Sequence, residues 1–229
     1  MGHTVGPVRI DCHKGSDVRG CESVMQMEWN ANHMILVGTV GGTAEFSHEN
    51  HGITYLRFPL RVCRLSGVED VLNVVAAQSL LDQLPVQPGE NLAVEGEVRS
   101  YNNRSGTGSK LVITVFARAM ERSREPHRND LTLAGVLCKP PILRRTPLGR
   151  EICDMMLAVN RRYGRADYLP CIAWGGLASW CSRLEVGDGL KLNGRLQSRE
   201  YTKEVGGTNE RRTAYEISVM SLEPIDEEP

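Results

Sequence analysis

Short runs in which apolar and polar residues alternate recur along the chain, and they follow the same order twice. A period of two is typical of strands that bury one face. The first set of runs comprises 34–40, 54–65, 71–77, 92–101 and 111–117, and the second comprises 131–137, 151–161, 168–174, 190–201 and 213–219. Short helical stretches at 78–84 and 177–184 follow the third run of each set.

Three strands, a helix and two strands is the order of a small Greek-key barrel of the oligonucleotide-binding (OB) type. The predicted fold class is therefore all-β, with two tandem five-stranded OB-fold barrels. Each barrel has one short helix between its third and fourth strands.

The two sets also match residue by residue when the sequence is shifted by about 97 positions. Repeats of this kind indicate two copies of one fold. Matching pairs are Asn32 and Asn129, Leu36 and Leu133, Gly38 and Gly135, Gly52 and Gly149, Leu60 and Leu157, Val62 and Val159, then, one position further, Gly89 and Gly187, Leu92 and Leu190, Gly96 and Gly194, Ser100 and Ser198.

The repeat sets the expected boundaries. Residues 28–122 form the first barrel, 123–128 a charged linker with Pro126, 129–222 the second barrel and 223–229 an acidic tail. Residues 1–27 show no period and are expected to be a disordered extension, within which Met25 or Met27 could be the natural start.

Composition narrows the class of protein. No stretch approaches the ~20 apolar residues of a membrane span, and no secretory signal is visible, which predicts a cytoplasmic, nucleoid-associated protein without a membrane partner. The 7 cysteines contain no zinc-ligand spacing, so neither a metal nor a cofactor is expected. Cys153 and Cys171 are predicted to be small buried hydrophobic residues.

Charge is distributed unevenly despite a net charge of −1. Residues 129–222 hold 14 Lys and Arg against 10 Asp and Glu, whereas residues 28–125 hold 9 against 11. The positive excess therefore lies in the second copy, where it favours an anionic ligand.

The second copy also combines aromatic and cationic residues near its open strands. Flat rings stack on unpaired bases and contribute ~1 to 3 kcal/mol per base, while cations follow the phosphates. The candidate stacking residues are Tyr163, Tyr168, Trp174 and Tyr201. The candidate phosphate ligands are Arg144, Arg145, Arg161, Arg162, Arg165, Arg195, Arg199, Lys203, Arg211 and Arg212. For Trp174, alternation leaves an orientation toward the core open.

Three segments of the second copy, 157–161, 173–178 and 194–201, resemble the bacterial single-stranded DNA-binding proteins in order and spacing. This resemblance implies sequence-independent binding of single-stranded DNA in replication, recombination and repair. It implies that the four aromatic residues occupy stacking positions, three of which commonly carry tryptophan. It also implies a homodimer that presents four barrels.

Family members end in a long tail whose acidic, apolar tip recruits replication and repair proteins. Residues 223–229 keep the acidity without a terminal Phe, so recruitment through this tail competes with the interpretation of a solvated charged terminus.

The first copy keeps the glycine and aliphatic framework without the aromatic residues. Ser66, Asp70 and Ala76 stand near the positions that match Tyr163, Tyr168 and Trp174. We expect this copy to serve fold, spacing and assembly, with Tyr55, Arg57, Arg61, Arg64 and Arg104 as supplementary contacts.

Other functions fit less well. No spacing of nucleophile, base and acid predicts an enzyme, and the segment 106–110 has no following helix that would make it a phosphate-binding loop. An adaptor of the same fold from a primosome or mobile element, with weak DNA binding, remains the alternative function. RNA as the ligand is a third possibility, because stacking does not distinguish the sugars.

Overall fold

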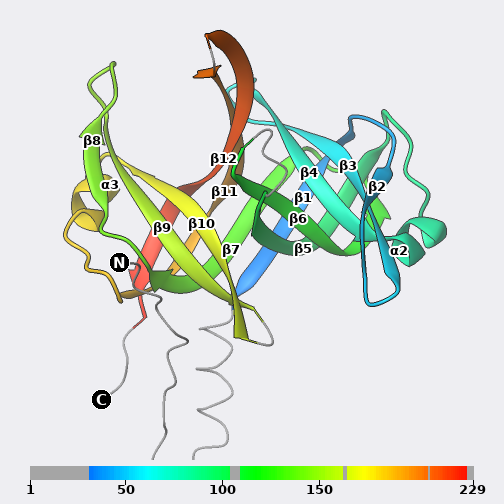
Figure 1. Cartoon of the computed structure of the whole chain (residues 1–229), viewed down its shortest axis with the longest axis horizontal. Helices are drawn as coiled ribbons and strands as arrows, with labels where there is room; N and C mark the ends of the chain where they lie inside the picture. Colours follow the sequence, from blue (N-terminus) through cyan, green and yellow to red (C-terminus); the bar gives the residue numbers. More distant parts are fainter. Residues whose placement is uncertain (1–30, 104–108, 162–163, 206, 226–229) are drawn as a thin grey trace, which may run out of the picture.

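The computed structural model describes residues 31–103, 109–161, 164–205 and 207–225. Figure 1 shows two halves side by side, each built mainly of curved antiparallel strands. The first half contains β1 (Asn32–Val40), β2 (Glu45–Asn50), β3 (Ile53–Cys63), β4 (Glu69–Ala77), α2 (Gln78–Gln83), β5 (Asn91–Asn102) and β6 (Leu111–Arg122). The second half contains β7 (Arg128–Leu137), β8 (Ile142–Arg145), β9 (Glu151–Arg161), β10 (Arg165–Trp174), α3 (Gly176–Cys181), β11 (Gly189–Val205) and β12 (Thr208–Pro224).

Within each half, the strands pair in a closed series, so that the last strand of the series pairs again with the first. In the first half β1 pairs with β3 and β5, β3 with β4, β4 with β6 in parallel, and β6 with β5. In the second half β7, β9, β10, β12 and β11 repeat this circuit, with β10 and β12 parallel. The all-β class is confirmed. Each half has one strand more than the five that the sequence predicts. The additional strands are β2, which pairs with β3, and β8, which pairs with β9.

The alternation of apolar residues places one side chain in two inside each circuit. Leu36, Leu60 and Leu92 are fully buried in the first half, and their counterparts in the repeat are fully buried in the second. Cys153 and Cys171 are buried as predicted. The buried apolar residues of both halves belong to one connected cluster, whose burial is the main stabilising contribution to the fold.

The repeated glycines lie where strands approach too closely for a side chain. A Cβ atom on Gly96 would lie 2.2 Å from the carbonyl oxygen of Phe116, and one on Gly194 would lie 2.6 Å from that of Ser218. The pairing of β5 with β6, and of β11 with β12, shifts register at these glycines, as expected for a β-bulge. The glycines are thus required by the bend of each circuit.

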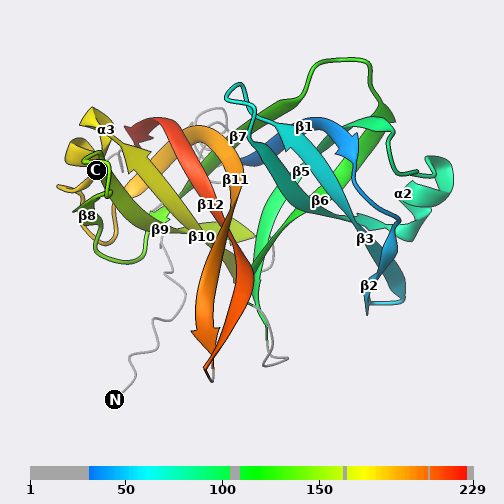
Figure 2. The same ribbon diagram turned by 90° about the horizontal axis from the view of Figure 1, so that it is seen from above.

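The two halves join through β1 and β7, which pair antiparallel with Leu36 opposite Asn129 and Asn32 opposite Leu133. Because these residues are equivalent in the repeat, the halves are related by an approximate twofold axis through this seam. The hairpin of β11 and β12 has strands of 17 residues each and projects from the body between the halves (Figures 1 and 2).

Candidate nucleic-acid interface

Two of the predicted stacking residues lie on the outer face of β10. Tyr168 exposes 52% and Trp174 41% of their surface, while Leu169, Cys171 and Ala173 between them are buried. Alternation along an extended strand gives this result, since successive side chains point to opposite faces. Trp174 therefore points to solvent, and the alternative orientation toward the core is wrong.

The outer face continues across the neighbouring strands. Trp174 pairs with Ile152 of β9, which pairs in turn with Arg144 of β8. Directly opposed residues share one face of a sheet. The face therefore brings an exposed indole and a guanidinium into one row across three strands.

Tyr201 lies on β11, opposite Arg212 of β12. The guanidinium carbon of Arg199 lies 6.0 Å from the centre of the Tyr201 ring, near the limit of a cation–π contact. Tyr201 is partly buried, so it has less free ring surface than Tyr168.

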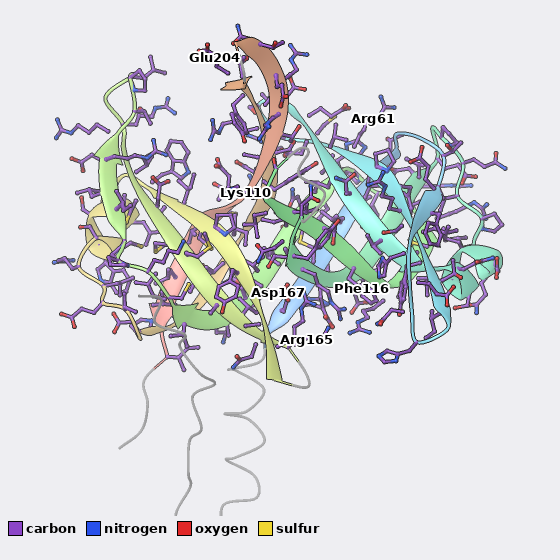
Figure 3. All side chains as sticks on the ribbon, in the orientation of Figure 1. Arg61, Lys110, Phe116, Arg165, Asp167 and Glu204 are labelled. Atoms are coloured by element: carbon purple, nitrogen blue, oxygen red, sulfur yellow. The ribbon has the colours of Figure 1, made fainter. Side chains whose placement is uncertain are left out.

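Apart from Arg161, five of the ten predicted phosphate ligands form ion pairs with neighbouring carboxylates among the described residues. The pairs are Arg144 with Asp154, Arg145 with Glu151 at 3.0 Å, Arg199 with Glu216 at 3.9 Å, Arg211 with Glu200 at 3.5 Å and Arg212 with Glu210 at 2.7 Å. Exposed pairs contribute only ~0 to 1 kcal/mol each, so a phosphate can compete for the guanidinium groups of Arg144, Arg145 and Arg211. The other two pairs are more enclosed, because the side chains of Arg212 and Glu216 are only 14% and 17% exposed. Arg165 and Arg195 form no ion pair within the described part of the chain. Figure 3 shows Arg165 at the lower end of the second half.

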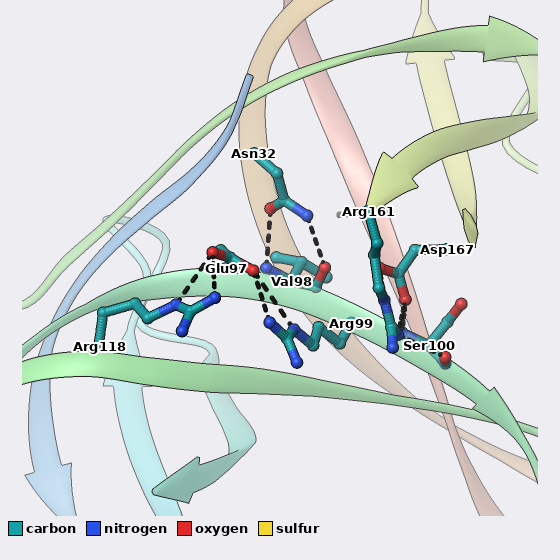
Figure 4. Close-up of polar contacts among 8 residues, drawn as sticks. All are labelled: Asn32, Glu97, Val98, Arg99, Ser100, Arg118, Arg161 and Asp167. Atoms are coloured by element: carbon teal, nitrogen blue, oxygen red, sulfur yellow. Dashed lines mark hydrogen bonds and ion pairs between the residues drawn. The ribbon is translucent and has the colours of Figure 1, made fainter. Parts of the chain in front are cut away.

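Arg161 has a different environment from the other predicted ligands. Its guanidinium donates to both carboxylate oxygens of Asp167, which is fully buried, and at 2.9 Å to the carbonyl oxygen of Ser100 in the first half. The backbone N–H of Ser100 donates to Asp167, and the backbone N–H of Tyr168 donates at 2.8 Å to Ser100 Oγ. Arg161 therefore holds the two halves together (Figure 4).

The repeat supplies a second contact of the same kind. We call these two contacts the Arg–Asp–Ser clasps. Arg64 donates to buried Asp70 at 2.8 and 2.6 Å and to the carbonyl oxygen of Ser198 at 3.1 Å. The backbone N–H of Ser198 donates to Asp70 at 2.7 Å. A buried carboxylate is tolerated only when it is paired and hydrogen-bonded, and both clasps meet that condition across the seam.

Sequence reasoning missed the clasps, although a signal was present. Arg64 and Arg161, Asp70 and Asp167, and Ser100 and Ser198 recur at the offset of the repeat. A charged residue that recurs inside an apolar run is expected to be buried together with a partner of opposite charge. When Asp70 is aligned with Tyr168 rather than with Asp167, as in the sequence analysis, this recurrence is overlooked.

The first half has an aromatic cluster of its own, which the sequence did not predict. The guanidinium carbons of Arg99 and Arg118 lie 3.9 and 5.0 Å from the centre of the Phe116 ring, and Tyr55 lies 5.6 Å from it. Glu97 accepts hydrogen bonds from both arginines at 2.8 to 3.3 Å (Figure 4). Of the two arginines in the cluster, Arg118 is about half exposed and Arg99 is largely covered.

Two candidates, Tyr163 and Arg162, lie outside the described residues, as do Arg104 and residues 1–27. Lys203 lies on β11, but its side chain is also outside the description. Within the described ranges, no group of three His, Cys, Asp or Glu side chains could hold a metal ion, and no helix is long and apolar enough to cross a membrane.

Solved structures show the same architecture. The crystal structure of wild-type single-stranded DNA binding protein from Thermus aquaticus superimposes with a TM-score of 0.71 at 25% identity, covering 86% of this chain and 94% of that one. Together with the repeated circuit of strands, this match defines the chain as an OB-fold protein.

Sequence comparisons find similar proteins that share one name. The model of the single-strand binding protein family matches residues 128–225. The single-stranded DNA-binding protein of Thermus thermophilus is 38% identical over 164 residues, which are 63% of this chain and 59% of that protein. The Thermus aquaticus protein is 39% identical over 112 residues, which are 47% of this chain and 41% of that protein. The second half of the chain is therefore similar to the single-strand binding protein family, and the matched segments span 59% and 41% of the length of these two relatives.

Proposed function

We propose that this protein binds single-stranded DNA without sequence specificity and protects it during replication, recombination and repair. The observation that carries the proposal is the outer face of β10, where Tyr168 and Trp174 stand exposed on a sheet rimmed by arginines. Exposed rings contribute little to the stability of the fold, so they mark a site of interaction. Unpaired bases stacked on these rings would cover them. The relatives bear the corresponding name.

Stacking on Tyr168, Trp174 and Tyr201 supplies the sequence-tolerant part of the binding energy. Arg144, Arg165, Arg195, Arg199 and Arg212 supply phosphate contacts, with Arg145, Arg211 and Lys203 further along the path. Arg161 is left out of this set, because its guanidinium is engaged by Asp167 and Ser100. Tyr163 and Arg162 remain candidates from the sequence.

The proposal assigns the two halves different tasks. Each half is a five-stranded OB barrel with β2 or β8 as an extension, the first spanning residues 28–122 and the second 129–222. The second barrel carries the main interface, which agrees with the match of the family model to residues 128–225. The first barrel holds the second in place through the seam and the clasps, and two chains form a homodimer.

The test is a fluorescence titration of the full chain with oligonucleotides of several lengths. Protein emission should be quenched by single-stranded oligonucleotides, because bases stack on Trp174 and the tyrosines. Duplexes of the same length should quench it far less, because their bases are already stacked. Equal quenching by both would refute the proposal.

A further inference from the structure

A cavity of about 410 Å³ opens at the junction of the two halves, next to the aromatic face. Lys110 and Leu111 at the start of β6 contribute one wall, and Pro170, Ile172, Tyr215 and Glu216 contribute the others. Lys110 is visible at this junction in Figure 3. The hydrogen bond from Ser109 Oγ to the carbonyl oxygen of Thr213, at 3.2 Å, fixes the first half against β12 at this place.

The cavity is continuous with the proposed interface. Pro170 and Ile172 lie on the same face of β10 as Tyr168 and Trp174, between these two rings, although Ile172 is largely buried. Tyr201 also lines the cavity. A strand stacked on this face would therefore pass the opening, and one base could turn into it.

Glu216 places a carboxylate on the wall of the cavity, where it forms a long ion pair with Arg199 but accepts no hydrogen bond from a described residue. Its side chain is 17% exposed, and its nearest cationic atom is Arg199 Nε at 3.9 Å, beyond hydrogen-bond distance. No described residue donates a hydrogen bond to it. Asp154, which also lines the cavity, differs in this respect, because Arg144 donates to both of its oxygens.

Lys110 supplies the complementary charge at the edge. It is exposed, and its ammonium group has no ion-pair partner among the described residues. A nucleotide whose base entered the cavity would carry a phosphate within reach of a cation at the edge. Apolar and aromatic walls, a carboxylate without a hydrogen-bond donor and a cation at the edge match the chemistry of a single nucleotide, and Asp154 and Arg212 also line the cavity.

We propose that this cavity takes one base of the bound strand and that Glu216 accepts a hydrogen bond from the exocyclic amino group of that base. The inference rests on the proposed function and adds a base preference to it. Cytosine presents an N4 amino donor, whereas thymine presents an O4 acceptor at the same position. A carboxylate attracts the first and repels the second, so the protein favours cytosine over thymine at one position.

The experiment compares the affinities of oligo-dC and oligo-dT of equal length for the full chain, by anisotropy of a labelled oligonucleotide. The variant Glu216→Gln offers both a donor and an acceptor and loses the negative charge. We expect the preference for dC over dT to be about tenfold smaller in Glu216→Gln than in the unmodified protein, since a base-edge contact is worth ~1 to 3 kcal/mol. The ratio is the readout, because loss of a negative charge strengthens binding of both oligomers.

Glu223→Gln is the matched control, since Glu223 lies on the same strand, is exposed and pairs with Lys191 at 3.4 Å away from the cavity. It should leave the dC to dT ratio unchanged. A second measurement needs no variant: oligo-dC methylated twice on N4 has no amino hydrogen to donate and should bind the unmodified protein about as oligo-dT does.

The possible failures are distinguishable. If neither oligomer binds the unmodified protein, the proposed function itself is wrong. If both bind but Glu216→Gln leaves the ratio unchanged, or if twice-methylated oligo-dC binds as tightly as oligo-dC, the cavity does not read the base and this inference is overturned.

Discussion

Tyr168 is the residue at which the proposed stacking can be tested with the least effect on folding. About half of its ring surface is open to solvent, and its neighbours Leu169 and Asp167 carry the burial at this point of β10. We expect Tyr168→Ala to weaken binding of single-stranded DNA by about tenfold, since stacking is worth ~1 to 3 kcal/mol per base. The thermal midpoint should change little.

Phe46→Ala is the control for this variant, because Phe46 is another exposed aromatic residue but lies on β2 in the first half. It should leave DNA affinity unchanged. A Tyr168→Ala protein that binds as tightly as the unmodified chain would show that the ring is not a stacking site.

Asp167 is the residue on which one clasp depends. Asp167→Asn removes a buried charge and leaves the Arg161 guanidinium with a weakened set of acceptors, which costs about 3 to 5 kcal/mol in comparable buried pairs. Urea unfolding should show this loss. Asp130→Asn removes one exposed partner of Arg128 and should cost less than ~1 kcal/mol. Equal losses in the two variants would contradict the role of the clasp.

At the scale of single residues, the sequence could place exposed rings but not the function of each arginine. Alternation in 168–174 puts Tyr168 and Trp174 on the same face of the strand, but it does not show whether that face points to solvent or to the core. The structure shows that it points to solvent, because Leu169 and Cys171 fill the interior. Arg161 looked like its neighbours along the chain. Its partner Ser100 is 61 positions away and comes close only through the pairing of the halves.

At the scale of elements, β5 and β6 are joined by a pH-sensitive contact on their outer face. Burial disfavours the charged form of Glu97, but hydrogen bonds from Arg99 and Arg118 outweigh it and lower the pKa of this carboxyl. A lowered pKa stabilises the fold at pH values above the ordinary value of ~4.3, and this contribution is lost as the pH falls through the pKa of the folded state.

We therefore expect the free energy of unfolding to fall less steeply below about pH 4 in Glu97→Gln than in the unmodified chain. Urea unfolding at several pH values measures this slope. Glu95→Gln, on the same strand and outside the arginine pair, should keep the steeper slope. Identical slopes in all three proteins would contradict the stabilising role of the contact.

The order of the elements could be predicted because most strands show a period-two pattern of apolar residues. In addition, the repeat shows each predicted element twice. β2 and β8 escaped detection, since their side chains are mostly exposed and leave no alternation in 45–50 or 142–145. The Phe116 cluster escaped because Tyr55, Arg99 and Phe116 come from three strands that only the closed pairing brings together.

The whole molecule consists of two similar halves related by an approximate twofold axis through the pairing of β1 with β7. β1 and β7 form the seam, and the two Arg–Asp–Ser clasps also connect the halves. Two chains would present four barrels. We expect the full chain of 25.4 kDa to sediment at twice that mass at micromolar concentration. A species of single mass over the whole concentration range would refute the homodimer.

We expect the aromatic and cationic face of the second half to bind unpaired bases. The most direct measurement is the affinity of the full chain for single-stranded and duplex oligonucleotides of equal length at rising salt. We predict binding of the single strand at least about tenfold tighter, with log K falling linearly with log salt by ~0.7 per phosphate contacted. Equal affinity for both forms, or single-strand binding that salt does not weaken, would contradict the account.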